Sequence, residues 1–183
     1  MTTASIDRAS LVRRAIVELV ADTGIHGATM SRVASRAGVA TGTAYVHYES
    51  KEQLLVAAFV EIKQRLGIVA TTDLDLSGKP AEIFATVWRR IYLHLSSDPH
   101  SARFSTQLDE SPLRRRAHEA LTDEDPLTLL AAEMTPHLVD LPVEILYELG
   151  IAPAVRLAAS GMTLDDPQLE RVVESCWRAI ARR

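Results

Sequence analysis

Residues 29–54 read TMSRVASRAGVATGTAYVHYESKEQL, and this stretch decides the fold. Two short helical patterns flank a turn at Gly38, and a third helix begins directly behind them. Thr29 is a favourable N-cap for the first pattern, because its hydroxyl can accept a hydrogen bond from a free amide of the first turn. Val33 and Ala34 give that helix an apolar face. Gly38 suits the tight turn because glycine readily adopts left-handed backbone conformations.

The second helical pattern, residues 41–48, is short and has little that could form a core. Its characteristic side chains are Thr41, Thr43, Tyr45, His47 and Tyr48. A compact polar and aromatic helix, held at an angle to its predecessor, is typical of a helix-turn-helix, whose second helix enters the major groove of DNA. The pattern therefore predicts DNA recognition.

Residues 38–55, GVATGTAYVHYESKEQLL, resemble the recognition region of the TetR (tetracycline repressor) family of transcriptional regulators. That region typically reads GVSxGTLYx(H/Y)F, followed by a short polar stretch and KExL. The ungapped resemblance covers residues 29–55, and a looser one extends back through residues 15–24. Two residues depart from the pattern. Ala44 replaces a bulky Leu or Phe, which indicates looser packing of the helix, and Thr41 stands where relatives often carry Lys or Arg.

The resemblance places the DNA contacts of the family in this region, and the residue types agree with it. A helix N-terminus and its hydroxyl cap can bind phosphate. Lys51 lies at the start of a helix, where a cation opposes the helix dipole, so neutralising a phosphate explains it better than capping. The expected DNA-binding residues are Thr29, Ser31, Arg32, Thr41, Gly42, Thr43, Tyr45, His47 and Lys51.

Composition agrees with an ordered, helical chain. The 183 residues are 47% hydrophobic, with eight Gly, eight Pro and few aromatic residues. The single cysteine, Cys176, argues against a disulfide scaffold and fits the reducing cytoplasm. No apolar run approaches the roughly 20 residues that a membrane span needs, and the N-terminus lacks the order of a signal peptide. We therefore expect a cytoplasmic protein without a membrane partner.

Net charge is unevenly distributed along the chain. The whole sequence carries −4, whereas residues 1–65 hold eight basic and six acidic residues, a net charge of +2, which leaves −6 for the remainder. A mildly basic N-terminal part on an otherwise acidic chain favours approach of the N-terminal part to phosphates. A charge of +2 over 65 residues is also common in ordinary domains, so it supports the motif without standing alone.

Helix start and stop signals predict an all-α chain in two domains, because no segment alternates with a period of two residues. A first helix over residues 6–23 stops at Gly24. Ser50 and Gln53 form a capping box for a long helix that links the domains. Further helices are expected over residues 83–95, 99–109, 112–121, 126–138, 142–160, with a kink at Gly150 and Pro153, and 167–181. The expected organisation is a three-helix, helix-turn-helix DNA-binding domain (1–49), a connecting helix (50–69) and a ligand-binding and dimerisation domain (70–183).

The second domain offers aromatic and apolar side chains that could form an ordinary helical core or line a ligand cavity. The resemblance favours the cavity, because related regulators sense small-molecule effectors in this domain. His94 and His137 are alternative polar groups for orienting a ligand. The expected pocket residues are Trp88, Tyr92, Phe104, Gln107, Leu108, Met134 and Tyr147.

The last two helical patterns are apolar on more than one face, which predicts burial both within their own domain and against a partner. The resemblance implies homodimerisation through a four-helix bundle, and a two-fold dimer matches a palindromic operator. The expected interface residues are Val155, Val172, Val173, Cys176, Trp177 and Ile180.

Enzyme chemistry finds little support in the sequence. The six histidines show no metal-ligand spacing, no phosphate-binding loop occurs, and Cys176 lies in an apolar helix. We therefore expect no catalytic residue, cofactor or metal. The function predicted is a dimeric regulator that binds double-stranded operator DNA, with repression and release by a small-molecule effector implied by the resemblance. The alternatives are a helical ligand-binding enzyme and a protein-binding module without DNA affinity.

Overall fold

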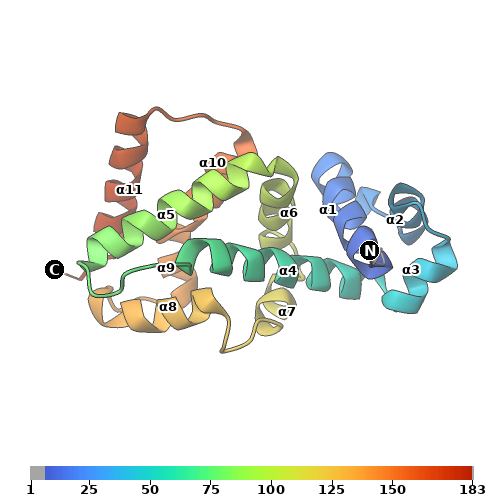
Figure 1. Cartoon of the computed structure of the whole chain (residues 1–183), viewed down its shortest axis with the longest axis horizontal. Coiled ribbons are helices and arrows are strands. Elements are labelled where there is room, and N and C mark those ends of the chain that lie inside the picture. Colours follow the sequence, from blue (N-terminus) through green and yellow to red (C-terminus); the bar gives the residue numbers. More distant parts are fainter. Residues whose placement is uncertain (1–6, 183) are drawn as a thin grey trace, which may run out of the picture. The chain divides into compact units, whose positions relative to one another are not determined.

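The computed structural model describes residues 7–182, which form eleven α-helices and one 3-10 turn (Figure 1). In this part of the chain the only strand-like pairing is an isolated antiparallel bridge between Leu138 and Ala181. The predicted all-α class is confirmed. Residues 1–6, which begin the expected first domain and include the expected start of its first helix, lie outside the described residues, as does Arg183.

The helices alternate with short connections along the whole described chain. They are α1 (Arg8–Gly27), α2 (Met30–Ala37), α3 (Thr41–His47), α4 (Lys51–Thr71), α5 (Pro80–Ser97), α6 (Pro99–Asp109), α7 (Arg114–Glu119), α8 (Pro126–Met134), the 3-10 turn η1 (Thr135–His137), α9 (Val143–Gly150), α10 (Ala152–Ser160) and α11 (Asp166–Ile180). The segment expected over residues 142–160 is two helices, divided at the predicted kink next to Gly150 and Pro153.

Helix ends follow their sequence signals with small shifts. Gly24 has φ +78° and interrupts α1, but helical structure resumes as far as Gly27. Ser50 caps α4 as predicted, since its hydroxyl accepts from the Gln53 amide at 3.1 Å. In a capping box, the Gln53 side chain would also accept from the backbone amide of Ser50. Here it accepts instead from the amide of Glu49, at 2.6 Å.

Packing divides the chain into two compact units that differ from the expected domain boundaries. The N-terminal unit contains the described residues through Ile62 together with Arg103–Leu121, and the C-terminal unit contains Lys63–Ala102 and the residues from Thr122 onward. The end of α6 and all of α7, expected in the second domain, therefore pack with the N-terminal helices. The physical reason is the burial of Phe104 and Leu108, which are fully inaccessible to solvent within the N-terminal core.

The N-terminal unit is held by one apolar cluster contributed by α1, α2, α3, α4, α6 and α7. Its fully buried members include Val12, Ile16, Val20, Val33, Leu54, Leu55, Phe59, Phe104, Leu108 and Ala117. A polar contact supports the same packing, because the Gln107 amide donates to the Val20 carbonyl at 3.0 Å. This cluster fixes the helices that carry the helix-turn-helix.

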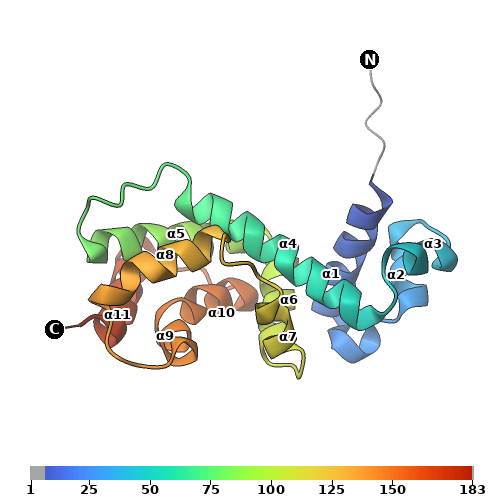
Figure 2. The ribbon, with the colours of Figure 1, turned by 90° about the horizontal axis from the view of Figure 1, so that it is seen from below.

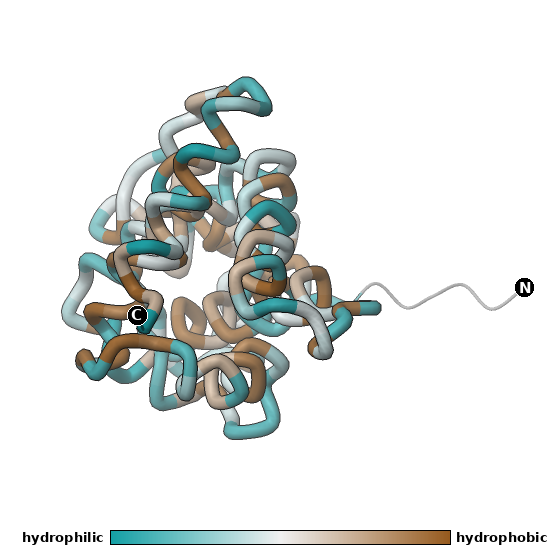
Figure 3. Tube along the Cα trace, turned by 90° about the vertical axis from the view of Figure 1, so that its left-hand side faces the viewer, coloured by the Kyte–Doolittle hydropathy of each residue, from teal (hydrophilic) through white to brown (hydrophobic). Residues whose placement is uncertain are grey.

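The C-terminal unit is built around α5, which packs against α10 and α11. Figure 2 shows the segment that leads from α4 into α5. In Figure 3, hydrophobic and hydrophilic residues alternate along the helices.

Polar groups of two buried aromatic residues are satisfied by backbone carbonyls. The Trp88 indole donates to Gly150 at 3.1 Å, and the Tyr92 hydroxyl donates to Met162 at 2.9 Å. Over the described residues, no helix combines the length and apolarity needed to cross a membrane.

Candidate nucleic-acid interface

The turn between α2 and α3 is closed by backbone hydrogen bonds. Gly38 adopts the left-handed region at φ +67°, and its amide donates to the Ser35 carbonyl at 3.2 Å, while the Val39 amide donates to the Ala34 carbonyl at 3.0 Å. These are the two bonds of a Schellman motif. At the other end of α2, the Thr29 hydroxyl accepts from the Arg32 amide at 3.3 Å. The predicted cap and turn are both confirmed, and the turn sets the angle between α2 and α3.

Helix α3 is anchored by small and aromatic residues at one side. Ala44 is its only buried residue, with no exposed surface, and Tyr48, which follows α3, is 7% exposed. The Tyr48 hydroxyl accepts from Arg13 at 2.6 Å and donates to the Ala9 carbonyl at 3.4 Å. The expectation that residues 41–48 contain little that could form a core is therefore wrong for Tyr48. Its ring fills the core while its hydroxyl reaches polar groups of α1.

Arg13 ties this anchor to α4. Its guanidinium binds the Glu61 carboxylate as well as the Tyr48 hydroxyl. Partial burial acts to lower the pKa of Arg13, but the hydrogen bonds to Glu61 and Tyr48 outweigh it, so the pKa is raised above its ordinary value. The resulting chain of contacts joins α1, the end of α3 and α4, and so holds α3 in a fixed orientation.

The opposite side of α3 is open. Thr41, Gly42, Tyr45 and His47 are exposed and Thr43 is half-buried, with half of the Tyr45 side chain accessible. A Cβ atom built on Gly42 would meet nothing within 4 Å. The residues predicted to contact DNA on α3 are therefore exposed or half-buried along one short helix, and none of them is fully buried.

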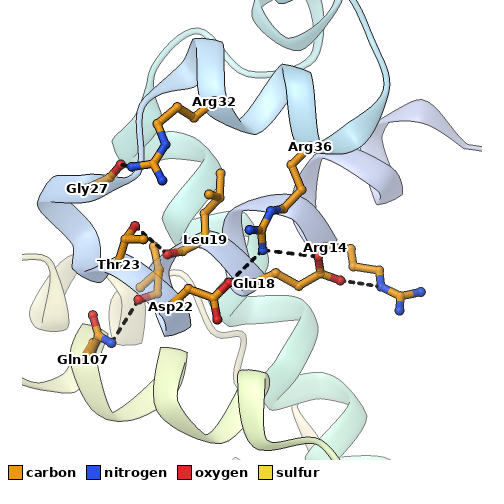
Figure 4. A network of polar contacts seen from close by, with 10 residues as sticks. Arg14, Glu18, Leu19, Asp22, Thr23, Gly27, Arg32, Arg36 and Gln107 are labelled. Atoms are coloured by element: carbon orange, nitrogen blue, oxygen red, sulfur yellow. Dashed lines mark hydrogen bonds and ion pairs between the residues drawn. The ribbon is translucent and has the colours of Figure 1, made fainter.

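The cationic side chains of α2 are partly engaged with α1, as Figure 4 shows. Arg32 donates to the Gly27 carbonyl, and Arg36 pairs with Asp22 at 2.9 Å and with Glu18 at 3.7 Å. A guanidinium has five N–H donors, so the single bond of Arg32 leaves others for phosphate. Ser31 and Thr29 are exposed beside it. The predicted α2 contacts thus remain geometrically available.

Lys51 has a structural role that the sequence did not indicate. Its ammonium group donates to the Ile25 carbonyl at 3.2 Å, near the interruption of α1 at Gly24. The preference for a phosphate contact over capping did not foresee this bond: Lys51 caps the end of a different helix, through a tertiary contact that helix-dipole reasoning on α4 cannot reveal. An ammonium group has two further N–H donors, so a phosphate contact by Lys51 remains a prediction.

The residues expected to line a ligand pocket do not fall in one unit. Trp88, Tyr92, Met134 and Tyr147 belong to the C-terminal unit. The remaining three, Phe104, Gln107 and Leu108, belong to the N-terminal unit and serve its core, with the Gln107 amide bound to the Val20 carbonyl. Their assignment to a cavity within the second domain is corrected accordingly.

One charged residue of the C-terminal unit was missed by the sequence analysis. Lys63 of α4 is only 7% exposed, and its ammonium group lies 5.2 Å from the centre of the Tyr147 ring, a cation–π contact. Its position on the buried face of α4 was the available signal, because a lysine there interrupts the apolar pattern. Among the described residues, no group of three or more His, Cys, Asp or Glu side chains could hold a metal ion.

The expected dimer residues mostly face the interior of their own subunit. Val155, Val173, Cys176 and Ile180 are at most 7% exposed, and the half-buried Trp177 packs on Phe84 with ring centres 5.4 Å apart. Burial raises the pKa of the Cys176 thiol. The exposed side of α11 is polar and includes Glu170, Arg171, Glu174 and Arg178. Four of the expected interface residues are therefore buried within the chain itself, where α11 packs against α5 and α9, and their place in a dimer interface stays a prediction.

Apolar side chains are nevertheless exposed elsewhere in the C-terminal unit. Five of them lie in α8, in α9 and in the segment between these helices: Leu129 (55% exposed), Leu141 (42%), Val143 (67%), Ile145 (44%) and Leu149 (41%). We call these five residues the α8–α9 patch. These residues are near one another in sequence, and exposed apolar side chains are candidates for an interaction surface.

Comparison with known proteins gives matches over both parts of the chain. Residues 12–58 match the family described as bacterial regulatory proteins, tetR family, and residues 81–181 match the tetracyclin repressor-like C-terminal domain. An uncharacterized HTH-type transcriptional regulator of Haemophilus influenzae is 26% identical over 187 residues, covering all of both chains. The fatty acid metabolism regulator protein of Bacillus subtilis is 32% identical over 114 residues, 58% of this chain and 57% of the relative. A crystal structure of a TetR-family transcriptional regulator from Haemophilus influenzae, 25% identical, superposes with a TM-score of 0.77 and covers 99% of this chain and 100% of its own.

Proposed function

The chain belongs to the TetR family of transcriptional regulators, and from this we propose that it binds operator DNA as a homodimer and is released by a small-molecule effector. The family is one of regulators rather than of enzymes. We place its action in the cytoplasm, where it represses transcription by occupying the operator.

The observation that carries the proposal is the surface of α3. This seven-residue helix buries one residue, Ala44, and exposes hydroxyl, phenol and imidazole groups. Such groups hydrogen-bond to base edges and phosphates in the major groove. Thr29, Ser31, Arg32 and Lys51 flank α3 with groups suited to phosphate. The proposal assigns base contacts to α3 and phosphate contacts to these flanking residues.

The test is selection of bound duplexes from a random library, followed by affinity measurements at several salt concentrations. A regulator of this kind should enrich a near-palindrome whose half-sites are separated by about one helical turn, or a multiple of it. Affinity should fall steeply as salt rises. Enrichment of no sequence, with no salt-dependent duplex binding, would contradict the proposal and favour a protein-binding role.

Removing the charge of Lys51 should weaken binding to every duplex by a similar factor. The negative slope of log affinity against log salt concentration should become shallower by about one for each half-site, because one phosphate contact is lost there. Lys51→Arg is the matched control, since it keeps a cation that can reach both phosphate and the Ile25 carbonyl. An unchanged salt slope in a folded Lys51→Ala protein would show that Lys51 serves only the end of α1.

We assign the dimer interface to the α8–α9 patch, because the outer side of α11 is polar and the apolar side of α11 is already buried. Placing a charge there by Val143→Asp should convert the dimer to a monomer, since an unpaired buried charge costs several kcal/mol. Light scattering at micromolar concentration measures the mass.

Two variants serve as controls for this interface. Leu93→Asp changes an apolar residue of α5 that is 60% exposed, and Ser175→Asp changes an exposed residue of α11. Both should remain dimers. A dimeric Val143→Asp protein together with a monomeric Ser175→Asp protein would return the interface to α11.

The effector site is proposed for the C-terminal unit, with α4 as the link, because α4 contributes residues to both units. Since one relative is named a fatty acid metabolism regulator, palmitate is the first probe. An effector lowers the affinity for operator only if it binds more tightly to the protein state that binds DNA poorly. The decrease is typically about 5–150-fold. Bound operator must lower the affinity for the effector by the same factor. Titrations of operator with and without palmitate, and of palmitate with and without operator, measure both factors.

A further inference from the structure

Val46 is the most exposed large apolar side chain in the described part of the chain. Its accessible fraction is 82%, compared with 67% or less for the others. It lies on α3 between Tyr45 and His47 and was not among the predicted DNA contacts. Single exposed apolar residues are common on protein surfaces, so exposure alone assigns no role. Its place on α3 is what distinguishes it.

Helix geometry puts Val46 at the centre of the outward face. An α-helix turns about 100° per residue. The buried residues Ala44 and Tyr48 define the inward direction, and the direction opposite to them coincides with Val46. Gly42, one turn earlier, lies beside it. The predicted contacts Thr43 and Tyr45 are placed on either side of this line.

The surface around Val46 can approach a partner closely. Gly42 has no side chain, and a Cβ atom there would meet nothing within 4 Å. An incoming surface can therefore come close to the backbone beside Val46. A β-branched side chain is also stiff, so ordering it at an interface costs little conformational entropy.

We propose that Val46 reads a thymine in each operator half-site, by contact of its methyl groups with the 5-methyl group of the base. This inference rests on the proposed function. The valine side chain has no hydrogen-bond donor or acceptor, so it cannot pair with the polar edges of guanine, adenine or cytosine. The thymine methyl is the apolar feature that the major groove presents. Val46 thus selects thymine over cytosine at one position of the half-site.

Burying one methyl group changes affinity by about fourfold. Two half-sites together give about 15-fold. This effect is small compared with loss of the operator contacts as a whole, but it is confined to one base position. Confinement to one position is what the experiment measures.

The test replaces each thymine of the selected operator by deoxyuridine, symmetrically in both half-sites, so that only the 5-methyl groups are removed. Wild-type protein should lose about 15-fold in affinity at one thymine position. Val46→Ala should bind the unmodified operator about 15-fold more weakly and should show no further loss at that position. Leu76→Ala, which shortens a 53% exposed leucine outside the N-terminal unit, is the matched control and should respond as wild type does.

The outcomes separate this proposal from the one on which it rests. Equal deoxyuridine losses in wild type and Val46→Ala at every thymine would overturn the role of Val46 while leaving a DNA-binding regulator intact. The role of Val46 would also be overturned if deoxyuridine at no thymine position lowered the affinity of the wild-type protein. Failure of the wild-type protein to bind any duplex would overturn both. Because Val46 is exposed, its alanine variant should keep the wild-type circular dichroism and melting temperature.

Discussion

Replacing Tyr45 and His47 together by alanine is expected to lower operator affinity about 1000-fold. Each side chain is exposed on α3 and is placed to contact DNA once per half-site, so the dimer loses four contacts. At about 1 kcal/mol for each contact, the sum approaches 4 kcal/mol, or about three powers of ten. Fluorescence anisotropy with the selected operator, at fixed salt, measures this loss.

The same double variant should remain folded, because neither side chain is buried. Its melting temperature and its mass in solution should equal those of the wild type. His137→Ala removes an exposed histidine from the C-terminal unit and should bind operator normally. Wild-type affinity in the double variant would mean that α3 is not the recognition helix.

Replacing Trp88 by alanine should have the largest effect on stability, a decrease of about 3–5 kcal/mol in the free energy of unfolding. The indole has no exposed surface, stacks on Tyr92 with ring centres 5.7 Å apart, and donates to the Gly150 carbonyl at 3.1 Å. Alanine would leave a large void and an unsatisfied buried carbonyl. Urea denaturation followed by circular dichroism measures the change.

Trp88→Phe separates packing from hydrogen bonding. Phenylalanine fills most of the volume but cannot donate to Gly150, so it should lose less stability than alanine does. The unsatisfied carbonyl accounts for about 1–3 kcal/mol of the difference from wild type. Equal stabilities of the wild type and the alanine variant would refute the view that Trp88 organises the C-terminal core.

Features specified by neighbouring residues could be predicted from the sequence. The Thr29 cap, the left-handed turn at Gly38 and the cap at Ser50 each depend on contacts within a few residues, and the all-α class follows from helical periodicity. The outward position of Tyr45 and His47 was predicted for the same reason. The break at Gly150 and Pro153 was also foreseen, because glycine and proline act on the local backbone.

Features that depend on distant partners could not be predicted. The burial of Tyr48 was not foreseen because its hydrogen-bond partners, the donor Arg13 and the accepting Ala9 carbonyl, are far away in sequence. Lys51 appeared to lack a structural role because its acceptor belongs to α1. Leu108 could have served either unit, since an apolar helical face does not specify what it packs against. Apolar periodicity in the last helix likewise could not distinguish a subunit core from a dimer interface.

The N-terminal core has a consequence for recombination among related regulators. Because Phe104 and Leu108 complete that core, the DNA-reading part is not one contiguous piece of chain. A chimaera that exchanges only the residues through Ile62 would set one parent's α1 and α4 against the other parent's α6. A chimaera that is to acquire a new operator specificity in this way must therefore exchange Arg103–Leu121 together with the first segment. Changes confined to the exposed side of α3 escape this restriction, so specificity can diverge there one residue at a time without disturbing the core.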